Sequence, residues 1–358
     1  MTETQRPPLR ATSPRRNRLG DIDVCYLTVM ARAIKRHKQS PTPLFEQFQI
    51  SEALLSTPDA RISIPRFMRL GQAAAMQTGS PTLGLDMGAE TRISDLGLAG
   101  LAAMSAPTLG DALSTLIRYT TLTSRNSRGH PSYVAGNQAV RAEFYSIRPY
   151  NDFNYFVVDS ILAGWTQFLR ELGGSSDLLR EVLIEYPERG QQEPFETYFG
   201  CPVHFGASAN ALILSSRKLQ APTTTAQPAL HRKLLDLCDA QRQRLESGWT
   251  LADHVKEQLA PRLRGEPPSL QQVAEAMGMA SWTLRRRLAE QSVTFRELLD
   301  QTRSELALDY VRDTDLSFAE IAWLLGFSGP AAFHRAFRRW RAVNPGDFRR
   351  GSRSNMPH

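Results

Sequence analysis

The feature that most constrains the fold of this chain is a segment near its C-terminus that occurs twice. Residues 269–291 read SLQQVAEAMGMASWTLRRRLAEQ, and residues 317–340 read SFAEIAWLLGFSGPAAFHRAFRRW. Each copy starts with serine and places a glycine nine residues later, Gly278 or Gly326. A glycine in the left-handed conformation ends a helix. Each copy therefore predicts a helix, a tight turn and a second helix, which is helix-turn-helix anatomy.

The second helix of each copy has one apolar face. Phe333 and Phe337 are four residues apart, and Leu284 and Leu288 take the same places in the first copy at an offset of 49. Arginines lie on the other sides of both helices. One alternative for either helix alone is an amphipathic surface helix with a solvated basic face. The repetition favours two recognition helices that each enter a major groove.

The segment between the copies, TFRELLDQTRSELALDYVRDTDL, carries a helical apolar stripe. It predicts one long helix that holds the two units rigidly apart. If the recognition helices are closer than one DNA turn, ~34 Å, the duplex must bend to reach both. In the second copy, Ser328 is placed to cap the recognition helix, and Pro330 suits its first turn.

The positive charge lies at the two ends of the chain. The formal net charge is +7, of which residues 1–19 carry +4 and residues 262–358 carry +4, whereas residues 20–261 carry −1. A basic end joined to a near-neutral body fits a polyanion-binding module on a different kind of domain.

Several other protein classes lack support in the sequence. Cys25, Cys201 and Cys238 are far apart and outside any Cys/His cluster, which argues against a metal site and for a reducing cytosol. No apolar run approaches the ~18 residues that span a bilayer. The N-terminus has no apolar signal-peptide core, so we expect a cytoplasmic protein with no membrane partner.

Two functional alternatives stay open beside a sequence-specific regulator. An enzyme with a DNA-docking block is disfavoured, because no nucleophile elbow, P-loop, zincin or dinucleotide motif occurs, and His130, His204 and His231 are isolated. We expect no cofactor. A sequence-indifferent DNA-coating protein is disfavoured by the near-neutral body and by a recognition helix that combines Trp282 with arginines.

The block 267–350 resembles the DNA-binding domain of AraC/XylS-type bacterial transcription regulators. The carrying stretches are LRRRLAEQ, RSELALDYV, EIAWLLGFSGPAAFHRAFRRW and NPGDFRR. The body, through RISIPRFMRLGQAAAMQTGSPTLGLDMG, TLGDALSTLIRYTTL and YFGCPVHFGASANALILSSRKL, is similar to the ligand domain of one AraC subgroup. That domain is often labelled arabinose-binding, although its members answer to many effectors.

The resemblance implies a transcription regulator, usually an activator, of a metabolic or transport operon. Its partners are double-stranded promoter DNA, RNA polymerase and a small effector. The predicted fold is an α+β ligand domain followed by an all-α domain of seven helices, in which a long helix joins two helix-turn-helix units on asymmetric DNA sites. The predicted divisions are a disordered basic tail at 1–20, the ligand domain at 21–230, a helical linker and candidate homodimer contact at 231–266, the DNA-binding domain at 267–350 and a tail at 351–358.

The first recognition helix exposes the better base readers. Arginine is the usual bidentate partner of guanine, and apolar groups contact the thymine methyl. The predicted base-reading residues are Trp282, Thr283, Arg285 and Arg286, and the predicted phosphate contacts are Ser281 and Arg287. The family pattern also places contacts at Trp282, Arg285 and Arg286. The alternative for each side chain is simple solvation.

The second recognition helix starts with Gly329, Pro330 and Ala331, which offer no side-chain hydrogen bond. Only His334 and Arg335 remain for polar readout, so we expect weaker sequence discrimination. Arg335 has an alternative role in a salt bridge within the domain. The predicted phosphate contacts here are Arg338, Arg339 and Arg349.

The body predicts a mixed α+β domain. Residues 139–147, 181–186 and 211–216 have strand character, and 159–172 has one apolar helical face. Aromatic residues at these spacings are more typical of a core than of a pocket, and this applies to Tyr119, Tyr145 and Trp165. The sequence does not identify the effector-binding residues.

Overall fold

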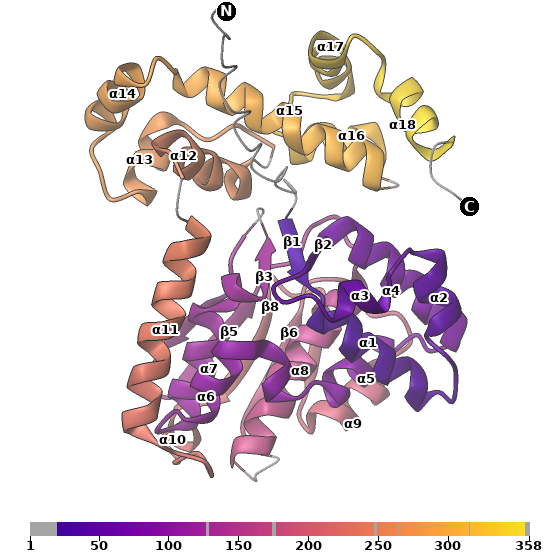
Figure 1. The fold of residues 1–358 in the computed structure, drawn as a ribbon, viewed down its shortest axis with the longest axis vertical. Coiled ribbons are helices and arrows are strands. Elements are labelled where there is room, and N and C mark those ends of the chain that lie inside the picture. Colours follow the sequence, from indigo (N-terminus) through magenta and orange to yellow (C-terminus); the bar gives the residue numbers. More distant parts are fainter. Residues whose placement is uncertain are drawn as a thin grey trace, which may run out of the picture.

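The computed structural model describes residues 20–126, 129–173, 177–246, 249–263, 265–314 and 316–354. An α+β N-terminal domain is followed by an all-helical C-terminal domain, as predicted (Figure 1). The predicted tail at 1–20 lies outside the described residues except for Gly20, which opens the first strand. Of the predicted tail at 351–358, residues 351–354 are helical and the rest lie outside the described residues.

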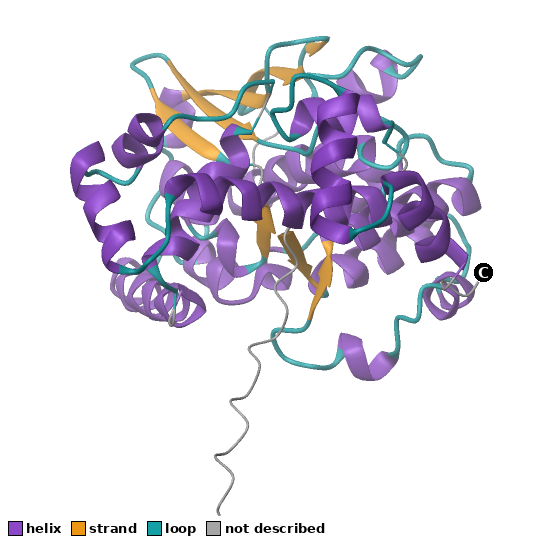
Figure 2. Cartoon of the chain, turned by 90° about the horizontal axis from the view of Figure 1, so that it is seen from above, coloured by secondary structure: helices purple, strands orange, loops and turns teal. Residues whose placement is uncertain are grey.

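The N-terminal domain contains two separate sheets, which Figure 2 shows as two groups of strands among helices. The smaller sheet has the antiparallel order β2-β1-β3. The larger has the order β4-β5-β8-β6-β7, antiparallel except for the parallel pair β6 and β7. The strands are β1 (Gly20–Asp23), β2 (Arg61–Ser63), β3 (Ser124–Asn126), β4 (Ser132–Ala135), β5 (Ala139–Phe144), β6 (Leu179–Ile184), β7 (Val203–Phe205) and β8 (Asn210–Ser215). The three strands predicted from the sequence are therefore present as β5, β6 and β8.

Helices cover these sheets. They are α1 (Cys25–Arg36), α2 (Thr42–Gln47), α3 (Glu52–Leu55), α4 (Ile64–Thr78), α5 (Leu83–Glu90), α6 (Gly97–Met104), α7 (Leu109–Arg118), α8 (Tyr155–Gly173), α9 (Gln192–Phe199) and α10 (Ser216–Leu219), with 3₁₀ turns η1 (Ile93–Leu96) and η2 (Thr120–Leu122). The predicted helix is α8, whose Trp165, Phe168 and Leu172 are buried. α5 packs closely on α8. The two helices approach so closely that a Cβ on Gly88 would lie 2.2 Å from the Cβ of Ala163.

The C-terminal domain begins earlier than predicted. Its described residues form seven helices: α12 (Leu251–Leu259), α13 (Leu270–Ala276), α14 (Ser281–Glu290), α15 (Phe295–Asp313), α16 (Phe318–Leu324), α17 (Pro330–Arg341) and α18 (Pro345–Ser354), with the 3₁₀ turn η3 (Ala260–Arg262) after α12. Val255 and Leu259 of α12 are fully buried in one cluster with side chains of α13 and α14. The expected domain start at 267 is therefore corrected to α12, because this helix completes the core of the first unit. Only α11 (Pro228–Glu246) connects the domains as a helical linker.

The two domains are in contact. One buried apolar cluster includes Phe67 and Ile147 of the N-terminal domain and also Leu306 and Tyr310 of α15. A small cavity lined by Met68 and Tyr310 lies at the same junction. The C-terminal domain thus rests on one end of the N-terminal domain, with α15 across it (Figure 1).

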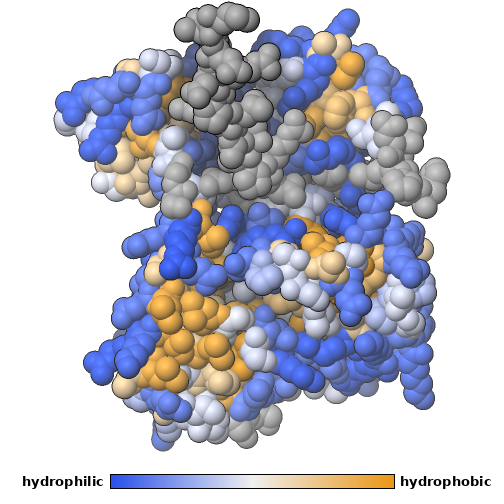
Figure 3. Space-filling view, viewed as in Figure 1, coloured by the Kyte–Doolittle hydropathy of each residue, from blue (hydrophilic) through white to orange (hydrophobic). Residues whose placement is uncertain are grey.

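An apolar area lies exposed on the N-terminal domain, over α6, α7 and α11 (Figure 3). Its large side chains are Leu101 of α6 and Leu230 and Leu237 of α11, which are 43%, 42% and 54% exposed. α11 packs against α6 and buries only His231 and Cys238, so much of this helix remains accessible. Within the described chain, no helix is both long enough and apolar enough to cross a bilayer.

Candidate nucleic-acid interface and ligand pocket

The first helix-turn-helix unit consists of α13 and α14. Ser269 opens α13 in a reciprocal capping arrangement with Gln272, and Gly278 starts the turn after α13 with φ +66°. Leu284 and Leu288 of α14 are buried in the unit's core, as the apolar spacing predicts. The helix is therefore fixed by one face and leaves the opposite face free for a partner.

The free face of α14 carries the predicted base readers. Trp282 is 65% exposed, and the guanidinium of Arg286 lies over its ring, 5.5 Å from the centroid. Arg286 is also 3.6 Å from the carboxylate of Glu290, one turn later. Arg285 and Arg287 are exposed as well. The indole and the carboxylate restrict the rotamers of Arg286, so it presents its donors in a limited set of directions.

Two other predicted side chains on α14 are less accessible. Ser281 and Thr283 are half-buried at the start of the helix. Both stand in the first turn, where a recognition helix contacts DNA, and their hydroxyls suit phosphate or base-edge hydrogen bonds.

The second unit repeats the frame with larger side chains. Ser317 and Glu320 form the reciprocal cap of α16, and Gly326 has φ +65°. Phe333 and Phe337 are both 0% exposed and anchor α17. The predicted cap by Ser328 is wrong: Gly329 occupies the N-cap without a side-chain bond, and Pro330 follows it in the first turn.

The polar readers of α17 are fewer. His334 is half-buried, with its ring edge-to-face on Phe318 at 5.1 Å between centroids. Arg335 is exposed and, among the described residues, makes no hydrogen bond or ion pair, so the alternative of a salt bridge within the domain is not seen. Arg335 is therefore the more accessible of the two predicted readers.

The predicted phosphate contacts of the second unit divide into two groups. Arg338 and Arg339 are exposed on α17. Arg349 instead donates to the carbonyls of Val311 and Leu316, at 3.1 and 2.7 Å, and lies over Phe318. Its guanidinium thus holds α18 against the end of α15, and the phosphate contact of Arg349 stays a prediction.

Two residues of α15 position neighbouring elements, and the apolar pattern of the sequence does not mark them. Asp300 accepts from Arg339 at 2.7 Å and from Nε1 of Trp340 at 2.9 Å, which ties α17 to α15. Arg303 donates from Nε to the carbonyl of Leu325 at 2.8 Å and lies over Phe327. Its partners belong to the turn between α16 and α17. Apolar periodicity does not report such contacts, since these residues lie on the polar side of a long helix.

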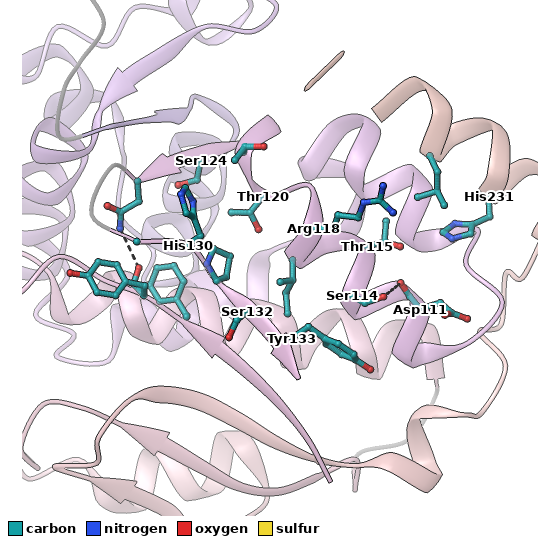
Figure 4. A pocket seen from close by; sticks show the side chains of 18 residues that line it. Asp111, Ser114, Thr115, Arg118, Thr120, Ser124, His130, Ser132, Tyr133 and His231 are labelled. Carbon is teal, nitrogen blue, oxygen red and sulfur yellow. Dashed lines mark hydrogen bonds between the residues drawn. The ribbon is translucent and has the colours of Figure 1, made fainter. Parts of the chain in front are cut away.

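The N-terminal domain contains a cavity of about 580 Å³ whose wall combines apolar, aromatic and polar side chains (Figure 4). α7 contributes Asp111, Ser114, Thr115 and Arg118 along one face, and β4 contributes Ser132 and Tyr133. Other lining residues are Thr120, Thr121, Ser124, Asn126, His130, Phe144, Tyr145, His231 and Leu235. The wall offers many hydroxyls, two opposite charges at the ends of the α7 face, and aromatic rings.

The charges of this cavity have partners. Arg118 pairs with Asp239 at 3.3 Å, and burial together with Asp111 raises the pKa of Tyr133. Loss of hydration and the charge of Arg262 lower the pKa of His130. Of the three aromatic residues considered from the sequence, Tyr145 lines the cavity, whereas Tyr119 and Trp165 are buried in the core.

Other chemistry has little support in the described residues. They contain no group of three or more His, Cys, Asp or Glu side chains placed to hold a metal ion. Burial raises the pKa of the thiols of Cys201 and Cys238 to about 11, so neither is a thiolate at neutral pH.

Comparison with known proteins gives matches for both domains. A family model described as the N-terminal arabinose-binding domain of AraC transcription regulators matches residues 39–223. A model described as a helix-turn-helix domain matches residues 273–351. The ornithine utilization regulator of Pseudomonas aeruginosa is 27% identical over 328 residues, or 92% of this chain and 96% of that protein.

Two further relatives extend along most of the chain. The HTH-type transcriptional regulator VirS of Mycobacterium tuberculosis is 26% identical over 309 residues, or 86% of this chain and 90% of that protein. The solved structure of the transcriptional regulator CdpR from Pseudomonas aeruginosa covers 89% of this chain and 97% of its own, with 25% identity and a TM-score of 0.43.

Proposed function

Because the chain belongs to the AraC family of DNA-binding transcription regulators, we propose that a small effector in its N-terminal cavity controls how the two helix-turn-helix units engage promoter DNA. The effector must favour one arrangement of the domains over another for binding to be coupled to regulation. The cavity and the recognition helices lie in different domains that pack on one another, which such coupling requires.

The observation that carries this proposal is a wall shared by two cavities. Thr121, Asn126 and His130 line the effector cavity and also a cavity of about 190 Å³ at the domain junction. Lys256 of α12 and Glu305 of α15 line the opposite side of the junction cavity and form an ion pair of 3.2 Å. A ligand that moves this wall changes the contact between the domains.

The chemistry of the cavity favours a small, polar effector that bears both charges. Asp111 and Arg118 provide opposite charges on one face of α7, with hydroxyls between them. The ornithine utilization regulator, by its name, serves the metabolism of a basic amino acid. Basic amino acids are therefore the first class to test, by calorimetric titration of the whole protein.

We assign different tasks to the two recognition helices. α14 reads base edges through Trp282, Thr283, Arg285 and Arg286 and contacts phosphate through Ser281 and Arg287. α17 reads base edges through the exposed Arg335 and the half-buried His334. It contacts phosphate through Arg338 and Arg339. Phosphate contacts position the protein, whereas base contacts specify the site.

A homodimer is proposed through the apolar area of Leu101, Leu230 and Leu237. These are three of the large apolar side chains left exposed in the described chain, and they lie on α6 and α11, which are in contact. Lys233 and Asp236 lie on the exposed side of α11, so antiparallel packing of two copies pairs opposite charges. As an activator, the protein would also contact RNA polymerase.

The dimer is tested by analytical ultracentrifugation. Leu237→Glu is expected to convert a dimer to a monomer. Met76→Glu is the matched control, because Met76 is 76% exposed on α4, outside the apolar area. A Leu237→Glu variant that stays dimeric, or a wild-type protein that is monomeric at tens of micromolar, contradicts this interface.

The proposed function as a whole is tested by genome-wide DNA occupancy in the host. We expect one or a few sharp sites beside a metabolic or transport operon, with occupancy that changes when the effector is supplied. Broad, unpeaked occupancy in the presence of the effector would instead support the DNA-coating alternative.

A further inference from the structure

A groove of about 770 Å³ runs between α15 and α17, apart from the major-groove face of α14. The first turns of α15 form one wall, and the exposed side of α17 forms the other. In Figure 1, α17 lies above α15 and the N-terminal domain lies below it. The groove therefore opens on the side of α15 that faces away from the N-terminal domain.

The groove is positively charged. Its arginines are Arg296, Arg303, Arg335 and Arg339, and its carboxylates are Glu297 and Asp300. Glu297 accepts from the backbone N and Oγ1 of Thr294, at 2.7 and 2.9 Å, as the cap of its own helix. Asp300 accepts from Arg339 and Trp340. Both carboxylates are thus occupied, and the arginines outnumber them.

The four arginines differ in how far they are engaged within the protein. Arg303 is engaged with backbone carbonyls, and Arg339 with Asp300. Arg296 and Arg335 are exposed and, among the described residues, make no hydrogen bond or ion pair. Arg335 is already assigned to base reading. Arg296, at the start of α15, is a free cation for which neither the sequence nor the recognition helices supply a task.

We propose that this groove seats the DNA phosphate backbone between the two major-groove contacts, and that Arg296 binds a phosphate there. Arg335 of α17, a proposed base reader, and Arg296 of α15 line the same groove. A duplex whose major groove holds α17 places the flanking phosphates beside that helix, over the groove.

The inference rests on the proposed DNA binding by both units. The experiment distinguishes failure of the groove contact from failure of that function. Affinity of the full-length protein is measured from 50 to 200 mM salt on a duplex that the wild-type protein has selected from a random library. Each phosphate contact adds about 0.9 to the slope of log affinity against log salt. The variants are Arg296→Ala, Arg296→Lys, Arg338→Ala as a phosphate contact already proposed, and Arg217→Ala as a control. Arg217 is exposed on α10, at the end of the N-terminal domain far from α15 (Figure 1).

The expected result is a slope reduced by about 0.9 in Arg296→Ala and unchanged in Arg217→Ala. Arg296→Lys is expected to keep the wild-type slope, because a lysine also neutralises a phosphate. If Arg338→Ala lowers the slope and Arg296→Ala does not, the groove contact is wrong while the proposed function stands. If the wild-type protein selects and binds no duplex, the proposed function fails with it.

Discussion

The two helix-turn-helix units have the same frame but different surfaces. Both begin with a serine cap, turn at a left-handed glycine and anchor the second helix by two buried side chains. The exposed first turns differ: α14 presents Trp282 and Arg285, whereas α17 presents Pro330 and Ala331. Fold and recognition are therefore carried by opposite faces of the same short helix.

The difference assigns discrimination mainly to the first unit. Arg286 and Arg335 occupy equivalent places in the repeat, but Arg286 has Trp282 and Glu290 beside it. Arg335 has no such neighbours in the described chain, and its helix is instead tied to α15 through Asp300. We therefore propose that the second unit mainly holds the protein in position on the duplex.

The largest expected effect distinguishes the two cores. Phe333→Ala should lower the free energy of unfolding by about 3–5 kcal/mol, and Leu284→Ala by about 2–5 kcal/mol. Phe333→Ala should lower the free energy of unfolding more, because the ring of Phe333 packs against Phe318, Phe327 and Phe337. Urea denaturation monitored by circular dichroism measures both, and a larger loss for Leu284→Ala contradicts the comparison.

The next largest effect concerns the recognition of base edges. Arg286→Ala should weaken binding to the selected site by about 1–3 kcal/mol and relax preference at one base pair. The equivalent Arg335→Ala should cost less and broaden preference less. Fluorescence anisotropy on the selected duplex and on single-base variants measures both. Arg338→Ala serves as the control, with a uniform loss on all sequences. If Arg286→Ala also weakens every sequence equally, the division between readers and positioners is wrong.

The turns differ in how tightly they are enclosed. Gly278→Ala and Gly326→Ala each force alanine into a left-handed conformation, at a cost of about 1–3 kcal/mol. Gly326→Ala should lower the stability more than Gly278→Ala does. A Cβ at Gly326 would lie 3.2 Å from the backbone of Glu266 and Pro267, whereas the site at Gly278 is open. Thermal unfolding of the two variants gives the order; equal losses would show that the second turn has room to adjust.

The smallest expected effect is at the tie between α15 and α17. Asp300→Asn should cost about 1 kcal/mol of stability, because it weakens hydrogen bonds from Arg339 and Trp340. Asp347→Asn is the matched control, since its partner Arg350 is exposed and such pairs contribute little. Denaturation midpoints of the two variants are compared. An equal effect means that the tie does not position α17.

The sequence predicted the elements that depend on local spacing. The second helix of each repeat, the long helix between the repeats and the glycine turns were predicted correctly, since each follows from apolar period or glycine placement. The cap at Ser328 was wrong because Gly329 already lies in extended backbone before Pro330. α12 was assigned to the linker because the GEPP turn after it resembles a domain boundary, although its apolar side chains complete the first core.

The rest depended on contacts between distant segments. β1, β2 and β3 have only three or four residues each and lie far apart in the chain, so alternation could not reveal them. The cavity is assembled from α7, the η2–β3 segment, β4, β5 and α11, and no single motif marks it. Arg349 looked available because its carbonyl partners become neighbours only after α15 and α18 pack.

We propose above all that the first unit discriminates sequence and that the second mainly positions the protein. Selection of binding sites from a random duplex library, followed by sequencing, measures the preference at every base pair. Our account predicts one half-site with strong preference where α14 binds and a second half-site with weak preference where α17 binds. Arg286→Ala should erode the strong half-site alone. Equal preference in both half-sites, or a stronger one under α17, would contradict it.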